Sequence, residues 1–192
     1  MEHIMKNKSG RLEVICGPMF SGKSEELIRR AKRAQIAGRP FKVFKPDIDN
    51  RYSLDHIAAH SGAKLQCTPV KGAQDIKLAL EGQPAQLIGI DECQFLEDEI
   101  TGIIEDLIER GFRVIVAGLD VDSSKSPFAP MPYLMAIAER VDKLTAVCSV
   151  CGEAATLTFR KVVNSADEQV FVGADNMYEA RCRAHWGWIY RK

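Results

Sequence analysis

The sequence predicts an α/β fold in which helices cover both faces of a parallel sheet, followed by a small metal-binding domain. Apolar segments alternate with helical patterns over most of the chain. A glycine-rich turn follows the first apolar segment, and two paired cysteine or histidine motifs lie near the C-terminus. Strands that are apolar on both faces and separated by helices are typical of parallel sheets between two helical layers.

The first elements are two strands joined by a helix. The segment RLEVIC (11–16) is predicted to be a strand. The segment 24–38 is predicted to be a helix, because its apolar residues recur on one face and Gly38 provides a stop. A second strand is expected over 41–45, where Pro46 ends it.

The following elements repeat this alternation. A buried strand is expected over 86–91, a helix over 97–111 and a nearly continuous apolar strand over 112–120. A further helix is predicted over 132–141 and a last strand over 143–147. After this point the composition changes to paired cysteines, glycine and short β-like segments.

Length and composition set the expected organisation. The chain has 192 residues, which fits one ordinary domain with a small attachment. We expect a flexible tail over 1–10, a nucleotide-binding domain over 11–146 and a small domain over 147–192. Lys plus Arg and Asp plus Glu both number 26. This balance argues against nucleic acid as a partner, because proteins that bind nucleic acid usually carry a basic surplus.

Targeting signals and an oxidising environment are not indicated. We find no apolar stretch long enough for a transmembrane helix, and the polar first residues lack the apolar core of a signal peptide. We therefore expect no membrane partner and a reducing, cytoplasmic location. In that setting Cys16, Cys67 and Cys93 are interpreted as ordinary thiols.

A candidate phosphate-binding loop lies between the first strand and the first helix. The segment GPMFSGKS (17–24) fits the P-loop pattern G-x-x-x-x-G-K-[ST]. Glycines let backbone N–H groups turn toward phosphate oxygens, and the following helix adds its positive N-terminus. Lys23 would reach the β- and γ-phosphates, and Ser24 would bind Mg²⁺. The alternative is a glycine-rich turn with a surface lysine. The loop comprises Gly17, Pro18, Met19, Phe20, Ser21, Gly22, Lys23 and Ser24.

An acidic pair ends the strand predicted over 86–91. Ligands in parallel sheets bind beyond the carboxyl ends of the strands. We therefore expect Asp91 and Glu92 to lie on the same edge as the phosphate loop and Asp120. Asp91 would hold Mg²⁺ through water, whereas Glu92 would orient water in an ATPase or accept a hydroxyl proton in a kinase. An acidic pair without a function is the alternative.

Two C-x-x-[CH] motifs predict a structural zinc site. Cys148 and Cys151 form the first motif, and Cys182 and His185 form the second. Three thiolates and one imidazole make a closed tetrahedral site, which leaves no open position for catalysis. The segment between the motifs would then be a loop pinned at its base, suited to act as a lid. Unconnected thiols and a surface histidine are the alternative.

The remaining histidines and a basic run are interpreted as surface features. His3, His56 and His60 have no partner pattern. The basic run RRAKR (29–33) is read as the solvated face of the first helix and not as a nucleic-acid patch.

Seven motifs follow one another along the chain. They are GPMFSGKS, DNRY (49–52), IDECQF (90–95), GLD (118–120), PF (127–128), the C-x-x-C of Cys148 and VGADNMYEARCRAH (172–185). In this order they resemble the thymidine kinases of the cytosolic, zinc-containing type that also occur throughout bacteria, and the resemblance covers about residues 10 to 186.

The resemblance implies a reaction and a set of partners. ATP and thymidine would give ADP and dTMP in nucleotide salvage for DNA synthesis, and deoxyuridine would be a further substrate. ATP, Mg²⁺ and structural Zn²⁺ are the implied cofactors. The family also implies feedback inhibition by dTTP and a homotetramer.

The resemblance also implies roles for individual residues. Glu92 would be the base that takes the 5′-hydroxyl proton, and Asp91 would lie near Mg²⁺. The ATP and Mg²⁺ site would further include Asp49, Asn50, Arg51, Cys93 and Gln94. The nucleoside pocket would be lined by the side chains of Met19, Phe95, Leu119, Ser123, Phe128, Thr158 and Tyr178. The thymine edge would be bound by backbone groups of a zinc-held lasso, namely those of Gln169, Val170, Phe171, Val172 and Gly173. Core packing is the alternative for Met19, Phe95, Leu119 and Phe128.

Two positions depart from the family pattern. Ser123 stands where an aromatic residue is usual, so one wall of the nucleoside pocket is altered. The usual Gly-Gly pair of the lasso is Gly173-Ala174, which restricts the backbone. Neither departure touches Lys23 or Glu92.

Two other classes of function remain open from the residues alone. A P-loop ATPase could couple hydrolysis to motion on nucleic acid, with the zinc unit as a DNA-binding ribbon. A zinc-ribbon interaction module could carry a decayed P-loop. Nucleoside-dependent turnover of ATP distinguishes the kinase from both.

Overall fold

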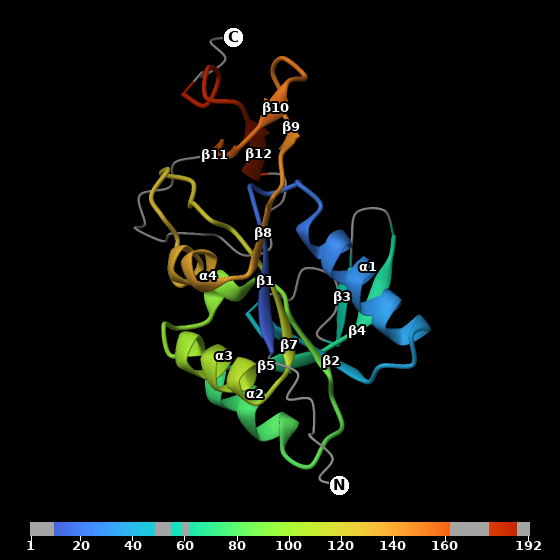
Figure 1. Ribbon diagram of the computed structural model, residues 1–192. Helices are drawn as coiled ribbons and strands as arrows, with labels where there is room; N and C mark the ends of the chain where they lie inside the picture. Colours follow the sequence, from blue (N-terminus) through green and yellow to red (C-terminus); the bar gives the residue numbers. More distant parts are fainter. Residues whose placement is uncertain (1–9, 49–54, 59–61, 162–176, 188–192) are drawn as a thin grey trace, which may run out of the picture.

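A six-stranded parallel sheet forms the centre of the protein in the computed structural model, which describes residues 10–48, 55–58, 62–161 and 177–187 (Figure 1). The strand order is β5-β2-β6-β7-β1-β8, and every pairing in the sheet is parallel. The strands are β1 (Arg11–Cys16), β2 (Phe41–Pro46), β5 (Thr68–Val70), β6 (Leu87–Ile90), β7 (Arg113–Gly118) and β8 (Arg140–Lys143).

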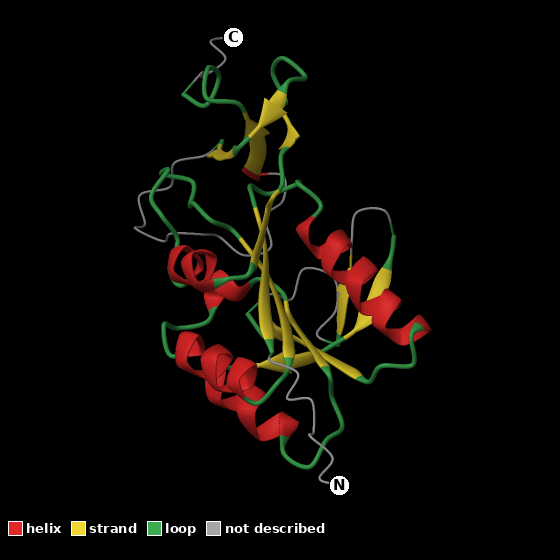
Figure 2. Ribbon diagram, viewed as in Figure 1, coloured by secondary structure: helices red, strands yellow, loops and turns green. Residues whose placement is uncertain are grey.

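Helices cover both faces of this sheet, as the sequence predicts (Figure 2). The helices are α1 (Lys23–Ile36), α2 (Ala73–Leu80), α3 (Ile100–Glu109) and α4 (Met131–Ile137), with a short 3₁₀ helix η1 (Cys93–Phe95). Successive residues of a strand point to opposite faces. Leu12 and Val14 therefore join the core beneath α2, α3 and α4, whereas Ile15 joins the core beneath α1.

Short antiparallel pairs complete the described chain. One hairpin, β3 (His56–Ala58) with β4 (Lys64–Gln66), lies beside α1 (Figure 1). Two more pairs lie beyond the carboxyl edge of the sheet, and they are β9 (Ala146–Val147) with β10 (Ala154–Ala155) and β11 (Leu157–Arg160) with β12 (Tyr178–Arg181). Ala146, Cys148, Ala155 and Ala180 form a small core between these pairs. This core is too small to hold the pairs together by apolar burial alone.

The predictions for residues 132–147 are partly wrong. The helix expected over 132–141 ends at Ile137, since Ala138 is already extended. The last strand of the sheet is Arg140–Lys143, not 143–147, and it pairs with β1. An edge strand is exposed on much of its surface, so β8 lacks the continuous apolar pattern of a buried strand. Ala146 and Val147 belong instead to the hairpin β9–β10.

The other predicted elements agree with the structure within a few residues at their ends. Strand 11–16 is found unchanged as β1. Helix 97–111 is shorter, as α3, because Gly111 adopts a left-handed conformation with φ 88° after its end. Hairpin β3–β4, strand β5 and helix α2 have no counterpart in the prediction. None of the helices in the described ranges is long and apolar enough to span a membrane.

Candidate active site and metal centre

The phosphate loop, the acidic pair and Asp120 meet at the carboxyl edge of the sheet. Strands β1, β7 and β6 are parallel neighbours, and Cys16 is paired in register with Gly118. The residues that follow these strands therefore emerge side by side. This confirms that the three segments converge on one edge, where ligands of parallel sheets bind.

The backbone of the phosphate loop requires glycine at both conserved places of the pattern. Gly17 has a φ of 139°, and a Cβ atom there would lie 2.4 Å from the carbonyl oxygen of Leu144. Gly22 is left-handed, with φ 83°, and directly precedes α1. Within the loop, the Ser21 hydroxyl donates a 2.8 Å hydrogen bond to the carbonyl of Pro18. The loop is thus a tight turn that leads into a helix N-terminus, as phosphate binding needs.

Lys23 lies inside the curve of the loop. Its side chain is 8% exposed, and Nζ donates a 2.7 Å hydrogen bond to the carbonyl of Pro18. Burying an ammonium group is costly unless it is compensated by close polar partners. The alternative of a solvated surface lysine is therefore wrong, and the positive charge is already held at the mouth of the loop.

Glu92 is held in place by a buried glutamine. Glu92 itself adopts a left-handed backbone, with φ 49°, between β6 and η1. Gln94 Nε2 donates a 2.6 Å hydrogen bond to Glu92 Oε2, and Gln94 Oε1 accepts a 3.0 Å hydrogen bond from the backbone N–H of Leu119. Gln94 is 4% exposed, so its amide is fixed by both contacts. The Glu92 carboxylate is therefore tied to the end of β7.

Gly118 leaves the space that Gln94 fills. A Cβ atom at Gly118 would lie 2.8 Å from Gln94 Oε1 and 2.7 Å from the sulfur of Met131. Both neighbours are buried. The absence of a side chain at the end of β7 therefore permits the hydrogen bonds that orient Glu92.

Asp91 and Cys93 flank Glu92 in different environments. The buried Asp91 carboxylate accepts a 3.1 Å hydrogen bond from the backbone N–H of Glu92, through Oδ1. Cys93 is fully buried in the apolar core beneath α2 and α3, and burial raises the pKa of its thiol. Its side chain is thus core packing, and only its backbone is available to a ligand.

Three of the residues predicted to line the nucleoside pocket are an aromatic pair and a serine in a turn. Phe95 and Phe128 form an edge-to-face pair with ring centroids 6.1 Å apart. Ser123 is half-buried in a turn in which Asp122 Oδ1 accepts hydrogen bonds from the backbone N–H groups of Ser124 and Ser126. The turn therefore provides no aromatic wall at position 123.

Thr158 connects the small C-terminal region to the phosphate loop. Its hydroxyl accepts a 3.0 Å hydrogen bond from the backbone N–H of Met19. Its carbonyl accepts a 3.1 Å hydrogen bond from the indole N–H of Trp186. The Lys125 ammonium lies 4.0 Å from the centre of the Trp186 ring, a cation–π contact. Sequence reasoning missed Trp186, although it directly follows the metal ligand His185.

Two further buried charges lie at this edge, Asp120, which was expected here, and Lys45, which was not. Asp120 is 4% exposed and its Oδ2 lies 2.6 Å from Lys143 Nζ, and this hydrogen bond raises the pKa of Lys143. The other oxygen, Oδ1, is buried without a hydrogen-bond partner among the described residues. Lys45 is 2% exposed near the end of β2. It lies beside Asp91, because the backbone N–H of Asp91 donates a hydrogen bond to the carbonyl of Phe44, the residue before Lys45. No sequence pattern distinguishes Lys45 from other charges next to strands.

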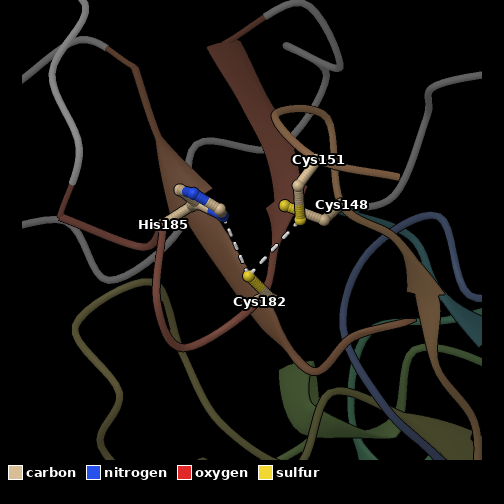
Figure 3. Close-up of side chains that lie close together, drawn as sticks. All are labelled: Cys148, Cys151, Cys182 and His185. Atoms are coloured by element: carbon tan, nitrogen blue, oxygen red, sulfur yellow. Dashed lines mark hydrogen bonds between the residues drawn. The ribbon is translucent and has the colours of Figure 1, made fainter. Parts of the chain in front are cut away.

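The four predicted metal ligands are brought together, which rejects the alternative of unconnected thiols (Figure 3). Cys148 and Cys151 lie in the turn after β9, where Gly152 has a φ of 77°. Cys182 and His185 lie in the turn after β12. All four ligand atoms lie within 4.8 Å of one another.

The spacing of these atoms fits a tetrahedral ion. The sulfur atoms of Cys151 and Cys182 are 3.8 Å apart, and Cys182 Sγ is 3.2 Å from His185 Nδ1. Two thiolates bound at about 2.3 Å in a tetrahedron are separated by roughly 3.8 Å. Burial acts to raise the pKa of Cys148, but backbone hydrogen bonds from Cys182 and Val150 outweigh it and lower that pKa to about 6. The donor set is therefore suited to Zn²⁺.

Several predicted residues lie outside the described residues. These are His3, Asp49, Asn50, Arg51, His60, Gln169, Val170, Phe171, Val172 and Gly173. His56 is described, and its ring lies 2.9 Å from the Asp55 carboxylate at the surface. The predicted lid is described only at its two ends.

A comparison with protein families gives one match across nearly the whole chain. The family model for thymidine kinase matches residues 10–186. The phosphate loop, the acidic pair and the four metal ligands all fall within this span, in agreement with the resemblance seen in the sequence. With the fold and the converging site residues, this match shows that the chain belongs to the thymidine kinase family and is an enzyme that phosphorylates thymidine.

Proposed function

We propose that this enzyme transfers the γ-phosphoryl group of ATP to the 5′-hydroxyl of thymidine, with Glu92 as the general base. The 5′-oxygen attacks the γ-phosphorus while its proton passes to the Glu92 carboxylate, and the bond from the γ-phosphorus to the β–γ bridging oxygen breaks to release ADP. The observation that supports this most is the Glu92 carboxylate held by Gln94 on the same sheet edge as the phosphate loop.

The phosphate loop would bind the β- and γ-phosphates. Lys23 Nζ now donates to a carbonyl of its own loop, which is a weaker partner than a phosphate oxygen. Upon ATP binding the ammonium would turn to the phosphates and offset the charge that develops during transfer. The loop backbone from Gly17 to Gly22 would donate further hydrogen bonds.

Oxygen ligands at the same edge fit Mg²⁺. Ser24 is half-buried in the first turn of α1, and the buried Asp91 carboxylate ends β6. A hydroxyl and a carboxylate are ligands that Mg²⁺ accepts alongside substrate phosphates and water. When bound, the ion would neutralise charge on the phosphates. Asp49, Asn50 and Arg51 are proposed to complete this region.

Gln94 acts as a positioning residue for the base. A carboxylate fixed by a buried amide loses little freedom when substrate binds, so its orientation is set in advance. The two hydrogen bonds of its amide support this role for Gln94 in place of direct ATP or Mg²⁺ binding. Asp91 also helps to position Glu92, because its carboxylate accepts a hydrogen bond from the Glu92 backbone N–H.

The nucleoside would lie against the aromatic pair formed by Phe95 and Phe128. Met19, Leu119, Ser123, Thr158 and Tyr178 are proposed to line the remaining walls, and backbone groups of residues 169–173 to read the thymine edge. Backbone hydrogen bonds to the thymine edge do not involve the methyl group of the base. Deoxyuridine, which lacks this methyl group, would therefore also be accepted. The half-buried Ser123 leaves one side of the pocket without an aromatic ring.

Zn²⁺ would be held by Cys148, Cys151, Cys182 and His185 in a structural role. Bound zinc would fix the turn that carries Trp186, and Trp186 in turn contacts Thr158 and, through it, the phosphate loop. We further propose, on the family resemblance, that residues 147–192 form a separate small domain, that dTTP inhibits the enzyme and that it works as a cytoplasmic homotetramer.

The experiment that tests this function measures ADP production from ATP and Mg²⁺. Thymidine, deoxyuridine, deoxycytidine or single-stranded DNA would be the added partner. We expect turnover when thymidine or deoxyuridine is added, and none when deoxycytidine or single-stranded DNA is added. Turnover that requires DNA, or that is equal without any acceptor, would contradict phosphoryl transfer to a nucleoside by ATP.

A further inference from the structure

A cavity rich in arginine lies at the amino edge of the sheet, opposite the candidate active site. It has a volume of about 750 Å³. Its lining comes from the first residues of β1 and β7, the segment before β6 and the C-terminal end of α1. β1 runs from this cavity to the phosphate loop at about 3.3 Å per residue, so the two sites are roughly 17 Å apart. The cavity is therefore not part of the nucleotide site.

Among the residues for which the structure is described, the lining of the cavity has four positive charges and no carboxylate. The four are Arg11, Arg33, Arg39 and Arg113. Arg33 belongs to the basic run 29–33, which is interpreted from the sequence as a solvated helix face. That interpretation is wrong for Arg30, which is 4% exposed and paired with Glu13, and Arg33 lines this cavity. Ligand pockets usually have volumes of about 300–1,000 Å³. Both the size and the charge of the cavity suit an anionic small molecule.

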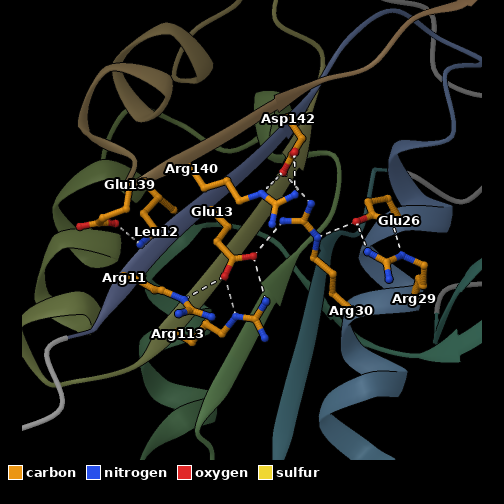
Figure 4. A network of polar contacts seen from close by, with 10 residues as sticks. All are labelled: Arg11, Leu12, Glu13, Glu26, Arg29, Arg30, Arg113, Glu139, Arg140 and Asp142. Atoms are coloured by element: carbon orange, nitrogen blue, oxygen red, sulfur yellow. Dashed lines mark hydrogen bonds and ion pairs between the residues drawn. The ribbon is translucent and has the colours of Figure 1, made fainter.

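Two of the arginines share a single carboxylate (Figure 4). Arg11 and Arg113 are register partners on adjacent strands, where like charges repel. Both donate to Glu13, Arg11 through Nε at 2.9 Å and Arg113 through Nε at 2.7 Å and Nη2 at 2.9 Å. Glu13 also accepts from Arg30 at 2.8 Å. One carboxylate therefore faces three guanidinium groups, and donors of Arg11 and Arg113 remain for a ligand.

The other two arginines have no polar side-chain partner within the part of the chain that the structure describes. Arg33 lies in the last turn of α1, and Arg39 follows the left-handed Gly38. A helix C-terminus carries only about half a negative charge, which offsets part of one guanidinium. The cavity thus keeps a surplus of positive charge that the described residues do not neutralise.

We propose that this cavity binds an oligophosphate, meaning two or more linked phosphates that are free or carried by a nucleoside. Guanidinium groups bind phosphate oxygens through two parallel hydrogen bonds, and several converging arginines favour a ligand with several negative charges. Ala34, Ala37 and Leu87 form an apolar wall beside the arginines, which leaves room for an uncharged part of the ligand. The proposal concerns binding only and does not depend on the proposed phosphoryl transfer.

The test must separate this cavity from the phosphate loop, which also binds phosphates. We would therefore titrate inorganic tripolyphosphate into full-length Lys23→Ala protein by isothermal titration calorimetry. One site is expected in this background. Arg33→Gln with Arg39→Gln should weaken it by roughly tenfold or more, because two guanidinium partners are lost. Both variants keep the Glu13 contacts intact, so the fold is retained.

A matched control removes two positive charges elsewhere. Lys32 on α1 and Lys77 on α2 are exposed and do not line the cavity. Lys32→Gln with Lys77→Gln should leave tripolyphosphate binding unchanged. Equal weakening in both double variants, or no binding in the Lys23→Ala background, would overturn the proposal.

Two further titrations identify the source of the phosphates. If ATP binds the cavity more tightly than tripolyphosphate, the ligand is a nucleotide, and if it binds no more tightly, the phosphate chain alone is recognised. Both outcomes support an oligophosphate site. Binding of adenosine or of citrate with equal affinity would overturn it, because neither carries phosphate. Thymidine kinase activity of the Arg33→Gln, Arg39→Gln double variant with Lys23 intact should equal wild type and so confirms folding.

Discussion

Gln94 holds the Glu92 carboxylate with a 2.6 Å hydrogen bond while its own carbonyl oxygen is bound to the N–H of Leu119. Glu92, the proposed base, is thereby attached to the end of β7, which neighbours the strand β1 that leads into the phosphate loop. Because the amide is buried, neither hydrogen bond is exchanged for water at low cost. The orientation of the Glu92 carboxylate is thus set by the folded sheet.

Replacing Gln94 with Glu should reduce kcat by roughly tenfold or more while the KM for thymidine changes little, because a second carboxylate beside Glu92 repels it. The acid limb of the pH–rate profile should move to higher pH, since the like charge disfavours the ionised base. The exposed Gln83→Glu adds the same charge away from the site and should behave as wild type. An unmoved pH profile in Gln94→Glu would refute the positioning role.

Glu92→Gln should lose about 10²–10⁴-fold in kcat, because no group remains to accept the 5′-hydroxyl proton. Binding of ATP and thymidine, measured by calorimetry, should remain close to wild type. Glu97 is exposed two residues beyond η1, and Glu97→Gln provides a control for the change in charge. Near wild-type turnover in Glu92→Gln would mean that Glu92 is not the base.

Cys182→Ser should lower bound zinc, measured by atomic absorption, and raise the KM for thymidine, because the turn that carries Trp186 loses its anchor. The melting temperature should fall as well. Cys67→Ser changes a buried thiol outside the metal centre and should keep full zinc content. If zinc content and thymidine KM both stay unchanged in Cys182→Ser, the ligand assignment fails.

Trp186→Phe should weaken the connection between the small C-terminal region and the phosphate loop. The ring is kept for Lys125, but the hydrogen bond to Thr158 is lost, which costs about 1 kcal/mol. We expect a higher KM for ATP with normal zinc content. Lys125→Met, which removes only the exposed cation–π partner, should have the smaller effect. The reverse order would show that the indole N–H does not support the loop.

Glu13→Gln should destabilise the fold by about 3 kcal/mol, because three guanidinium groups lose a shared buried partner. Burial acts to raise the pKa of Glu13, but hydrogen bonds and charges of Arg113, Arg11 and Arg30 lower it below its ordinary value of 4.5. Its stabilising contribution is therefore complete above that value and is lost as pH falls through the lower folded pKa. The free energy of unfolding should depend less on acid pH in Glu13→Gln than in wild type, and an equal dependence would exclude this role.

The sequence predicts those features of the fold and the site that depend on residues close together in the chain. GPMFSGKS and the two C-x-x-[CH] motifs are read from spacing alone, and the structure places Lys23, Cys148 and His185 as that spacing requires. Strands such as β6 are found because burial on both faces leaves a continuous apolar run. The edge strand β8 was not predicted, because three of its four residues are exposed and three are charged.

Residues that act through distant partners are harder to predict. Gln94 looks like part of an acidic motif, and only the fold shows that its amide reaches Leu119, 25 residues away. Trp186 reaches Thr158 across 28 residues, and Arg33 joins Arg113 at the cavity only because α1 lies on the sheet. Sequence spacing carries no information about such contacts, since they depend on how elements pack.

The glycine at the end of β7, Gly118, limits which amino-acid substitutions such enzymes can tolerate as they evolve. Residue 118 cannot acquire even a methyl group while Gln94 and Met131 occupy the space above it. A lineage that replaced Gly118 first would displace the amide that orients the base, and one that replaced Gln94 first would leave an empty space and an unanchored Glu92. Substitutions at positions 94 and 118 should therefore appear together or not at all among functional descendants of this sequence.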